Sequence, residues 1–103
     1  MSRREKLEGM LAKQPDDIFL QYALAMELMK EGAIDGAVAQ FDRVLQTDPT
    51  YIAAYQQKAQ ALARGNRMAD AAACLDQGIQ AAARAGDHHA AEEMQSFKMS
   101  LGA

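Results

Sequence analysis

The chain has few of the residues that crosslink a small protein or interrupt its helices. Among its 103 residues there is a single cysteine, Cys74, and the only prolines are Pro15 and Pro49. One cysteine excludes an intrachain disulfide and fits a reducing compartment. β-Branched residues are also sparse, whereas alanine is abundant, and this mixture favours helices over strands. Because half of the residues are apolar, the chain can bury the core of one domain without disulfides or metal.

The sequence also lacks a long apolar run. A secretory signal needs an apolar stretch of about 7–15 residues, and a membrane span needs about 20. Neither follows the charged N-terminus. We therefore expect a soluble protein of the cytoplasm that does not enter a membrane.

A strongly basic face is missing as well. The formal net charge is -3, and the one basic run, Arg3, Arg4 and Lys6, is interrupted by Glu5. Proteins that bind nucleic acid usually present a basic face. We interpret this run as the solvated start of a helix and expect no nucleic-acid partner.

Motifs of catalysis are absent too. The sequence contains no Gly-rich phosphate loop, no HExxH pattern and no GxSxG pattern. Cys74 lies among Ala72, Ala73 and Leu75, which favours a buried, inert thiol over a nucleophile. We expect neither enzyme activity nor a bound cofactor.

One cluster of metal-ligand types needs a separate interpretation. His88 and Glu92 are four residues apart, as are His89 and Glu93, so each pair shares a helix face. A structural zinc site usually has four ligands, mostly Cys or His. We therefore interpret these residues as pairs on a helix surface and expect no metal.

What the sequence does contain is an internal repeat with a period of about 34 residues, a length typical of helical repeat architectures. The two prolines are separated by one period, and residues of similar size recur with it. The matching apolar and small pairs are Leu7 with Phe41, Met10 with Val44, Leu11 with Leu45, Phe41 with Leu75, Leu45 with Ile79, Ala25 with Ala59, Leu28 with Leu62, and Ala37 with Ala71.

Each period divides into two helical segments, as judged from apolar residues at spacings of three and four. The predicted helices cover about 2–13, 16–31, 34–47, 50–64, 67–85 and 88–101. Gly32, the Gly65-Asn66 pair and Gly86 are the expected helix stops. Asp48-Pro49 should separate the two full periods, because proline ends one helix and the aspartate suits the cap of the next.

A helix–turn–helix unit of about 34 residues resembles the tetratricopeptide repeat family, and here it extends over nearly the whole chain. The family pattern has a large aromatic residue, Leu-Gly and Tyr in the first helix, then Ala, a large apolar residue and Pro. The matching residues are Leu24, Ala25, Leu28, Ala37, Phe41 and Pro49 in the first unit, and Tyr55, Ala59, Leu62, Ala71 and Leu75 in the second. The departures are Gln21 at the aromatic place, Lys58 at the Leu place and Ala83 at the Pro place.

The resemblance implies an all-α fold, a right-handed superhelix of antiparallel helix hairpins with about six helices. We expect a single domain, 1–103, with a leading half-repeat (1–15), a first repeat (16–49), a second repeat (50–85) and a capping helix (86–103). A stable stack usually needs three units, so the half-repeat and the capping helix would cover its open ends. The helices should approach most closely at the small residues Ala25, Ala37, Ala59 and Ala71.

The resemblance also implies a non-catalytic protein–protein interaction module. The first helix of each pair would line a concave face that binds a peptide or helix of another protein. By matching positions, the partner-binding candidates are Phe19, Tyr22, Met26, Met29 and Lys30 in the first unit, and Gln56, Gln60 and Arg64 in the second. The first set is large and apolar, which suits a partner with apolar anchors. This hypothesis predicts that Tyr22 and Met26 are substantially exposed; the alternative is that the stripe belongs to the core.

Two further possibilities concern the partner. The apolar stripe could mediate self-association, in which case a homodimer would be the working unit. Some family members clamp the C-terminal carboxylate of a partner with Lys, Asn and Arg side chains on this surface. The matching places here hold no basic cluster, so we do not expect that specificity; they are Tyr22, Met26, Ala53, Gln56 and Gln57.

Overall fold

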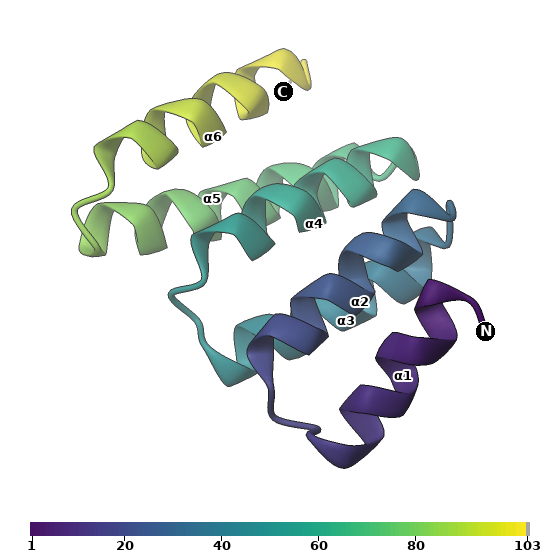
Figure 1. Cartoon of the computed structure of the whole chain (residues 1–103). Coiled ribbons are helices and arrows are strands. Elements are labelled where there is room, and N and C mark those ends of the chain that lie inside the picture. Colours follow the sequence, from purple (N-terminus) through teal and green to yellow (C-terminus); the bar gives the residue numbers. More distant parts are fainter. Residues whose placement is uncertain (103) are drawn as a thin grey trace.

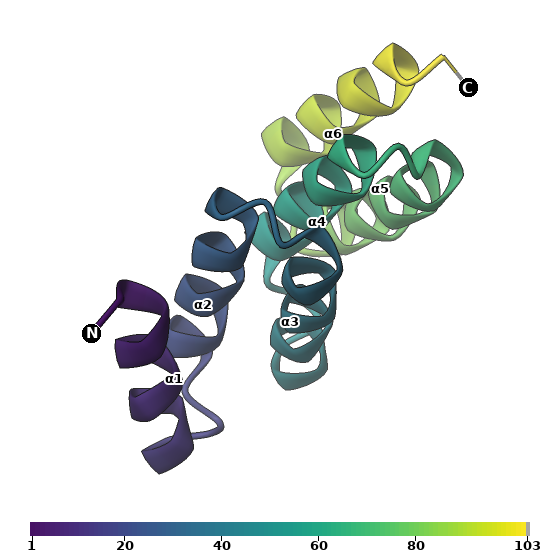
Figure 2. The same ribbon diagram turned by 90° about the vertical axis from the view of Figure 1, so that its right-hand side faces the viewer.

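Six α-helices make up the part of the chain that the computed structural model describes, residues 1–102 (Figure 1). They are α1 (Arg3–Lys13), α2 (Ile18–Lys30), α3 (Ile34–Thr47), α4 (Ile52–Arg64), α5 (Met68–Arg84) and α6 (His88–Ser100). Each helix packs against the next one along the chain. In the turned view of Figure 2 the helices follow one another from α1 at one end to α6 at the other. The predicted all-α fold of helix hairpins is confirmed.

The predicted helix ends lie within two residues of the observed ones, and the error at the start of α4 has a local cause. Helix α4 was expected to begin at residue 50 with Asp48 as its cap, but it begins at Ile52 and Tyr51 is its N-cap. The Asp48 carboxylate instead accepts hydrogen bonds from the backbone N–H and the hydroxyl of Thr50, at 2.9 and 2.6 Å. These bonds lower the pKa of Asp48. Asp48 thus closes a short turn in the connection and does not cap the helix.

The helix stops recur with the repeat, but at one of them the left-handed residue is not the glycine. Gly32 and Gly86 have φ values of 81° and 75°, in the left-handed region that glycine tolerates. In the stop between them, Asn66 and not Gly65 has the positive φ, 61°. Asn66 occupies the place in the second repeat that Gly32 has in the first, and asparagine is one of the few side chains that enter this region readily.

The alanines lie where the repeat predicts close helix contact. Ala25, Ala37, Ala59 and Ala71 are all 0% exposed. Around them the side chains form two buried clusters, one mainly over α1 to α3 and one over α4 to α6. Partly buried Val38 from α3 packs against both clusters, so the core continues along the array.

The first helix of each repeat is attached to the preceding proline by the same kind of hydrogen bond. The Gln21 amide donates to the carbonyl oxygen of Pro15, with an N···O distance of 2.9 Å. In the next repeat the Tyr55 hydroxyl donates to the carbonyl oxygen of Pro49, at 2.7 Å. Gln21, which departs from the aromatic residue of the family pattern, therefore makes the same connection as the aromatic Tyr55.

A second hydrogen bond recurs between the two helices of each pair. The Gln40 amide of α3 donates to the backbone carbonyl of Gln21, at 3.3 Å. At the matching place one period later in α5, the thiol of Cys74 donates to the carbonyl of Tyr55, also at 3.3 Å. Both donors are buried. Cys74 thus has a structural place in the repeat.

Gly78 shows how the second repeat accommodates its larger tyrosine. It occupies the place that Val44, which is fully buried, has in the first repeat. A Cβ atom at Gly78 would lie 2.7 Å from the Cβ of Tyr55 and 2.6 Å from the sulfur of Met94. The first repeat combines Gln21 with Val44, and the second combines Tyr55 with glycine, so the larger residue faces the smaller one.

Without a proline at position 83, the second repeat is longer than the first. Helix α5 has 17 residues, whereas α3 has 14. Helix α4 starts one period after α2, but α6 starts two residues later than one period after α4. The extra length displaces α6 from the strict repeat.

Gly78→Ala should destabilise the protein by about 1–3 kcal/mol, because the added methyl group overpacks the contact with Tyr55 and Met94. The free energy of unfolding, measured by urea titration, tests this. Gly9→Ala in α1 is the matched control, since nothing lies within 4 Å of its added Cβ. It should stabilise the protein by up to about 1 kcal/mol through helix propensity. Equal effects of the two substitutions would contradict this account of Gly78.

Candidate functional site

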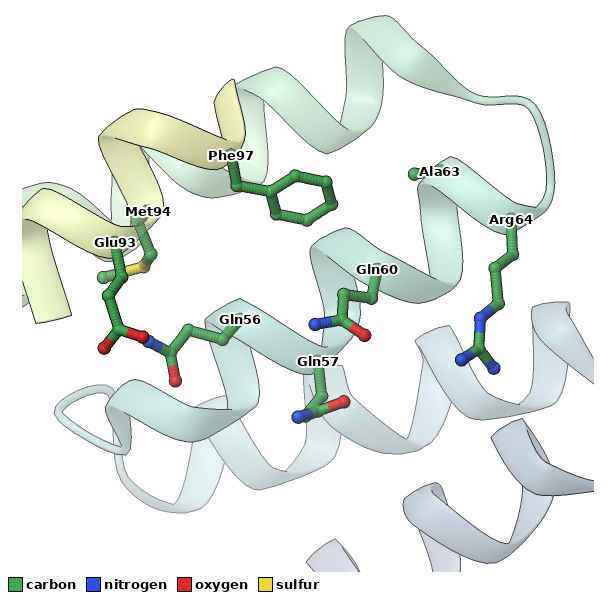
Figure 3. A pocket seen from close by; sticks show the side chains of 8 residues that line it. All are labelled: Gln56, Gln57, Gln60, Ala63, Arg64, Glu93, Met94 and Phe97. Carbon is green, nitrogen blue, oxygen red and sulfur yellow. The ribbon is translucent and has the colours of Figure 1, made fainter. Parts of the chain in front are cut away.

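A groove of about 570 Å³ lies between α4 and α6 (Figure 3). Helix α4 lines it with Gln56, Gln57, Gln60, Ala63 and Arg64, and α6 lines it with Glu93, Met94 and Phe97. Helix α5 separates the two walls along the chain and packs against both of their helices. The groove is therefore a product of the repeat and does not come from any single helix.

The division of α4 into two faces explains its wall of the groove. Tyr55, Ala59 and Leu62 are buried in the cluster shared with α5. Gln56, Gln60 and Ala63 follow each of them by one residue, and helical spacing places these side chains together on an adjoining face. The buried face fixes the helix, and the adjoining face is open for contacts.

Amide groups dominate the α4 wall. Gln60 is exposed, and Gln56 and Gln57 are half-buried. Within residues 1–102 none of the three side chains makes a hydrogen bond to another residue. Each amide offers two donor hydrogens and an acceptor oxygen. The wall can therefore pair with both the N–H and the C=O groups of an extended backbone.

Opposite charges occupy the two ends of the groove. Figure 3 shows Glu93 beside Gln56 at one end and Arg64 at the other. Arg64 forms no ion pair with any residue that the structure describes. Glu93 lies 3.2 Å from the His89 ring on its own helix, and both side chains are more than half exposed. An exposed pair of this kind contributes little to stability. The charged groups of both Glu93 and Arg64 are therefore available to a ligand.

The middle of the groove is apolar. The ring of Phe97 points from α6 toward Gln60 and Ala63 (Figure 3). Phe97 is half-buried and packs against the cluster that contains Met94, which is itself buried. An apolar side chain of a ligand would find a preformed, partly covered surface here.

The predicted binding residues fall into two groups. Gln56, Gln60 and Arg64 line the groove together. The candidates on α2 do not line it. Phe19 is 76% exposed and Lys30 is also exposed.

Tyr22 and Met26 were predicted to be substantially exposed, and they are half-buried. The Tyr22 ring lies edge-on to Phe41, with centroids 5.9 Å apart, and 5.2 Å from the ring of Tyr51. Burial raises the pKa of Tyr22, and Tyr51 adds to the effect. The apolar stripe on α2 is thus in part an extension of the core.

Met29 requires a correction. It was predicted to line the binding face, but it is 5% exposed and belongs to the buried cluster with Leu24 and Leu28. Helix α2 packs against α1, α3 and α4, so more of its circumference is buried than in a helix at the end of the array. Met29 lies on that buried part.

Sequence reasoning missed the wall that α6 supplies. Glu93 was interpreted only as a member of a pair on a helix surface, and Met94 and Phe97 only as part of the capping helix. Counted from the start of each helix, Met94 and Phe97 of α6 occupy the positions of Leu24 and Glu27 in α2. In α2, Leu24 is buried and Glu27 pairs with Arg3 of the neighbouring α1. This correspondence was the signal that could have identified the α6 wall. The two extra residues before α6 obscure it, because they shift α6 out of the 34-residue period.

Other chemistry finds little support in residues 1–102. No group of three or more His, Cys, Asp or Glu side chains there is arranged to hold a metal ion. None of the described helices is long and apolar enough to cross a membrane. Burial raises the pKa of the Cys74 thiol from 9.0 to about 11, which disfavours the reactive thiolate.

Cys74 should therefore react slowly with Ellman's reagent in the folded protein. The raised pKa lowers the thiolate fraction at pH 8 by about a hundredfold, and burial slows access further. A matched control is the exposed Ala73→Cys in a Cys74→Ala background, which should react at nearly the rate of the unfolded chain. Equal rates for the two folded proteins would show that Cys74 is not protected.

Comparisons with known proteins agree with this architecture. The sequence model of the tetratricopeptide repeat family matches residues 28–94. The TPR repeat-containing protein PA0015 of Pseudomonas aeruginosa is 32% identical over 97 residues, which cover 94% of this chain and 92% of that protein.

Solved structures give the same result. The solution structure of protein BPP2914 from Bordetella parapertussis has a TM-score of 0.86 at 28% identity, covering 99% of this chain and 89% of that one. The TPR2B domain of yeast Sti1, in its pHsp70 complex, also has a TM-score of 0.86, at 22% identity. The match covers 96% of this chain and 79% of that one. The last likeness concerns the fold alone. By sequence and by structure, this chain belongs to the tetratricopeptide repeat family.

Proposed function

We propose that this protein is a non-catalytic interaction module that binds an extended peptide segment of another protein in the groove between α4 and α6. The observation that carries the proposal is the groove itself, where amides, two opposite charges and an aromatic ring converge from two helices. Members of the tetratricopeptide repeat family are generally interaction modules without catalytic activity. The pHsp70 complex of the Sti1 domain is consistent with a protein partner on this fold.

The form of the groove favours an extended segment over a helix. A helix satisfies its own backbone groups, whereas an extended peptide presents N–H and C=O groups along its length. The three glutamine side chains can pair with such groups. The apolar surface at Phe97 then provides a place for one side chain of the peptide.

Compartment and oligomeric state remain predictions. The single cysteine supports a reducing compartment such as the cytoplasm. Self-association through α2 is supported by one observation, the highly exposed Phe19, and the test below separates it from peptide binding.

Filling the groove should weaken peptide binding. Peptides selected by phage display on the immobilised protein would be titrated into labelled protein and followed by amide chemical shifts. The largest shifts are expected in α4 and α6. Gln60→Trp should weaken binding at least about tenfold, because an indole at this exposed site occupies the volume that the peptide needs. Circular dichroism would check that the variant is folded.

Phe19→Ala is the matched control, because it removes an exposed aromatic residue outside the groove. It should leave peptide affinity unchanged. If Phe19→Ala weakens binding and Gln60→Trp does not, the ligand sits on α2 and the proposed site is wrong. A mass of two chains by light scattering that Phe19→Ala reduces to one would favour self-association instead.

A further inference from the structure

We infer that the groove selects a bipolar peptide, a segment of about five extended residues with a basic side chain at one end, an acidic one at the other and an apolar residue between them. This inference rests on the proposed function and adds the chemistry of the partner. It follows from three features of the groove, which are its charged ends, its length and its apolar middle.

The charged ends set the first requirement. The carboxylate of Glu93 and the guanidinium of Arg64 lie at opposite ends (Figure 3). Arg64 has no ionic partner among residues 1–102, and Glu93 has only the exposed His89. A wholly acidic segment would be attracted by Arg64 and repelled by Glu93, and the reverse holds for a wholly basic one. Only a segment with both signs is attracted at both ends.

The length of the wall sets the second requirement. Gln56 of α4 lies beside Glu93, and Arg64 follows Gln56 by eight residues on α4. At about 1.5 Å per residue this is about 12 Å. An extended chain advances about 3.3 Å per residue, so about four steps, which join five residues, span the groove. The two charged side chains of the partner should therefore be four positions apart, which also places them on the same face of the extended segment.

The middle of the groove sets the third requirement. Phe97 and Ala63 lie toward each other across it, and the buried Met94 lies beside Glu93 on the same helix as Phe97 (Figure 3). A charged residue placed there would lose hydration without gaining an ionic partner. An aliphatic residue instead adds apolar contact with the ring. The glutamines leave the rest of the segment unspecified, since they pair with backbone groups.

Four labelled peptides test the inference. They share the core Ala-Leu-Ala and are flanked by Lys and Asp, by two Lys, or by two Asp. The mixed peptide is made in both orders because charge does not fix chain direction. Fluorescence polarisation gives the affinities at low salt. Wild type should bind the better mixed peptide at least about fivefold more tightly than either like-charged peptide.

Substitution at each end should switch the preference. Arg64→Glu makes both ends acidic, so this variant should prefer the peptide with two Lys. Glu93→Arg makes both ends basic and should prefer the peptide with two Asp. Arg84→Glu on α5 makes the same charge change as Arg64→Glu at an exposed site that does not line the groove, and it should keep the wild-type preference.

The outcomes separate this inference from the proposed function. If wild type binds all four peptides within twofold or binds none of them, or if Arg84→Glu switches as Arg64→Glu does, the bipolar selection is wrong. The groove as a binding site would still stand in each case if Gln60→Trp weakens binding of the phage-selected peptides at least about tenfold. If Gln60→Trp has no effect on those peptides, the groove is not the site and both proposals fail.

Discussion

The close contact between paired helices at fully buried alanines is the constraint on which the rest of the structure depends. Ala25 and Ala37 are fully buried in the first repeat, and Ala59 and Ala71 occupy the matching places in the second. Small side chains there let the backbones approach. Buried donors on the second helix of each pair then reach main-chain carbonyls of the first helix. Larger residues at the alanine positions would separate the helices and leave those donors unpaired, at a cost beyond the lost packing.

The same constraint orients the outward face of each first helix. Once Ala59 lies against α5, rotation of α4 about its axis is fixed, and Gln56 and Gln60 must point away from the buried cluster. The hydrogen bond from Tyr55 to Pro49 fixes the beginning of the same helix. Residues that hold the fold and residues available for binding therefore alternate along α4. This separation allows the groove to change in sequence without loss of the core.

Much of the fold could be predicted because it depends on local signals repeated at a fixed period. The prolines, the glycine stops and the alanines each specify a feature that needs no knowledge of distant residues, and the structure follows them closely. Gln21 shows the limit of pattern matching, because an amide makes the bond for which the second repeat uses an aromatic residue. Gly78 shows another, since its fit depends on Tyr55 and Met94 in two other helices.

The site was harder to predict because it depends on how many neighbours each helix has. Apolar spacing on α2 identifies a stripe but does not tell whether one side or several sides are covered. Met29 is buried because α2 lies within the array, whereas Phe19, at the start of the same helix, is exposed. The contribution of Phe97 requires the position of α6, which depends on the two extra residues of the second repeat. Those residues carry no pattern of their own.

The position of α6 connects the packing of the second repeat to the width of the groove. Met94 seats α6 against Gly78 of α5, and the ammonium of Lys98 lies 2.7 Å from the carboxylate of Asp76 on α5. Both contacts hold α6 to α5, while Phe97 extends from the same helix into the groove. A change at the α5–α6 contact would therefore move one wall of the groove while α4 stays in place. Because the glycine lets side chains of both α4 and α6 lie against α5 at one point, the residue that accommodates Tyr55 in the core also determines what the groove can hold.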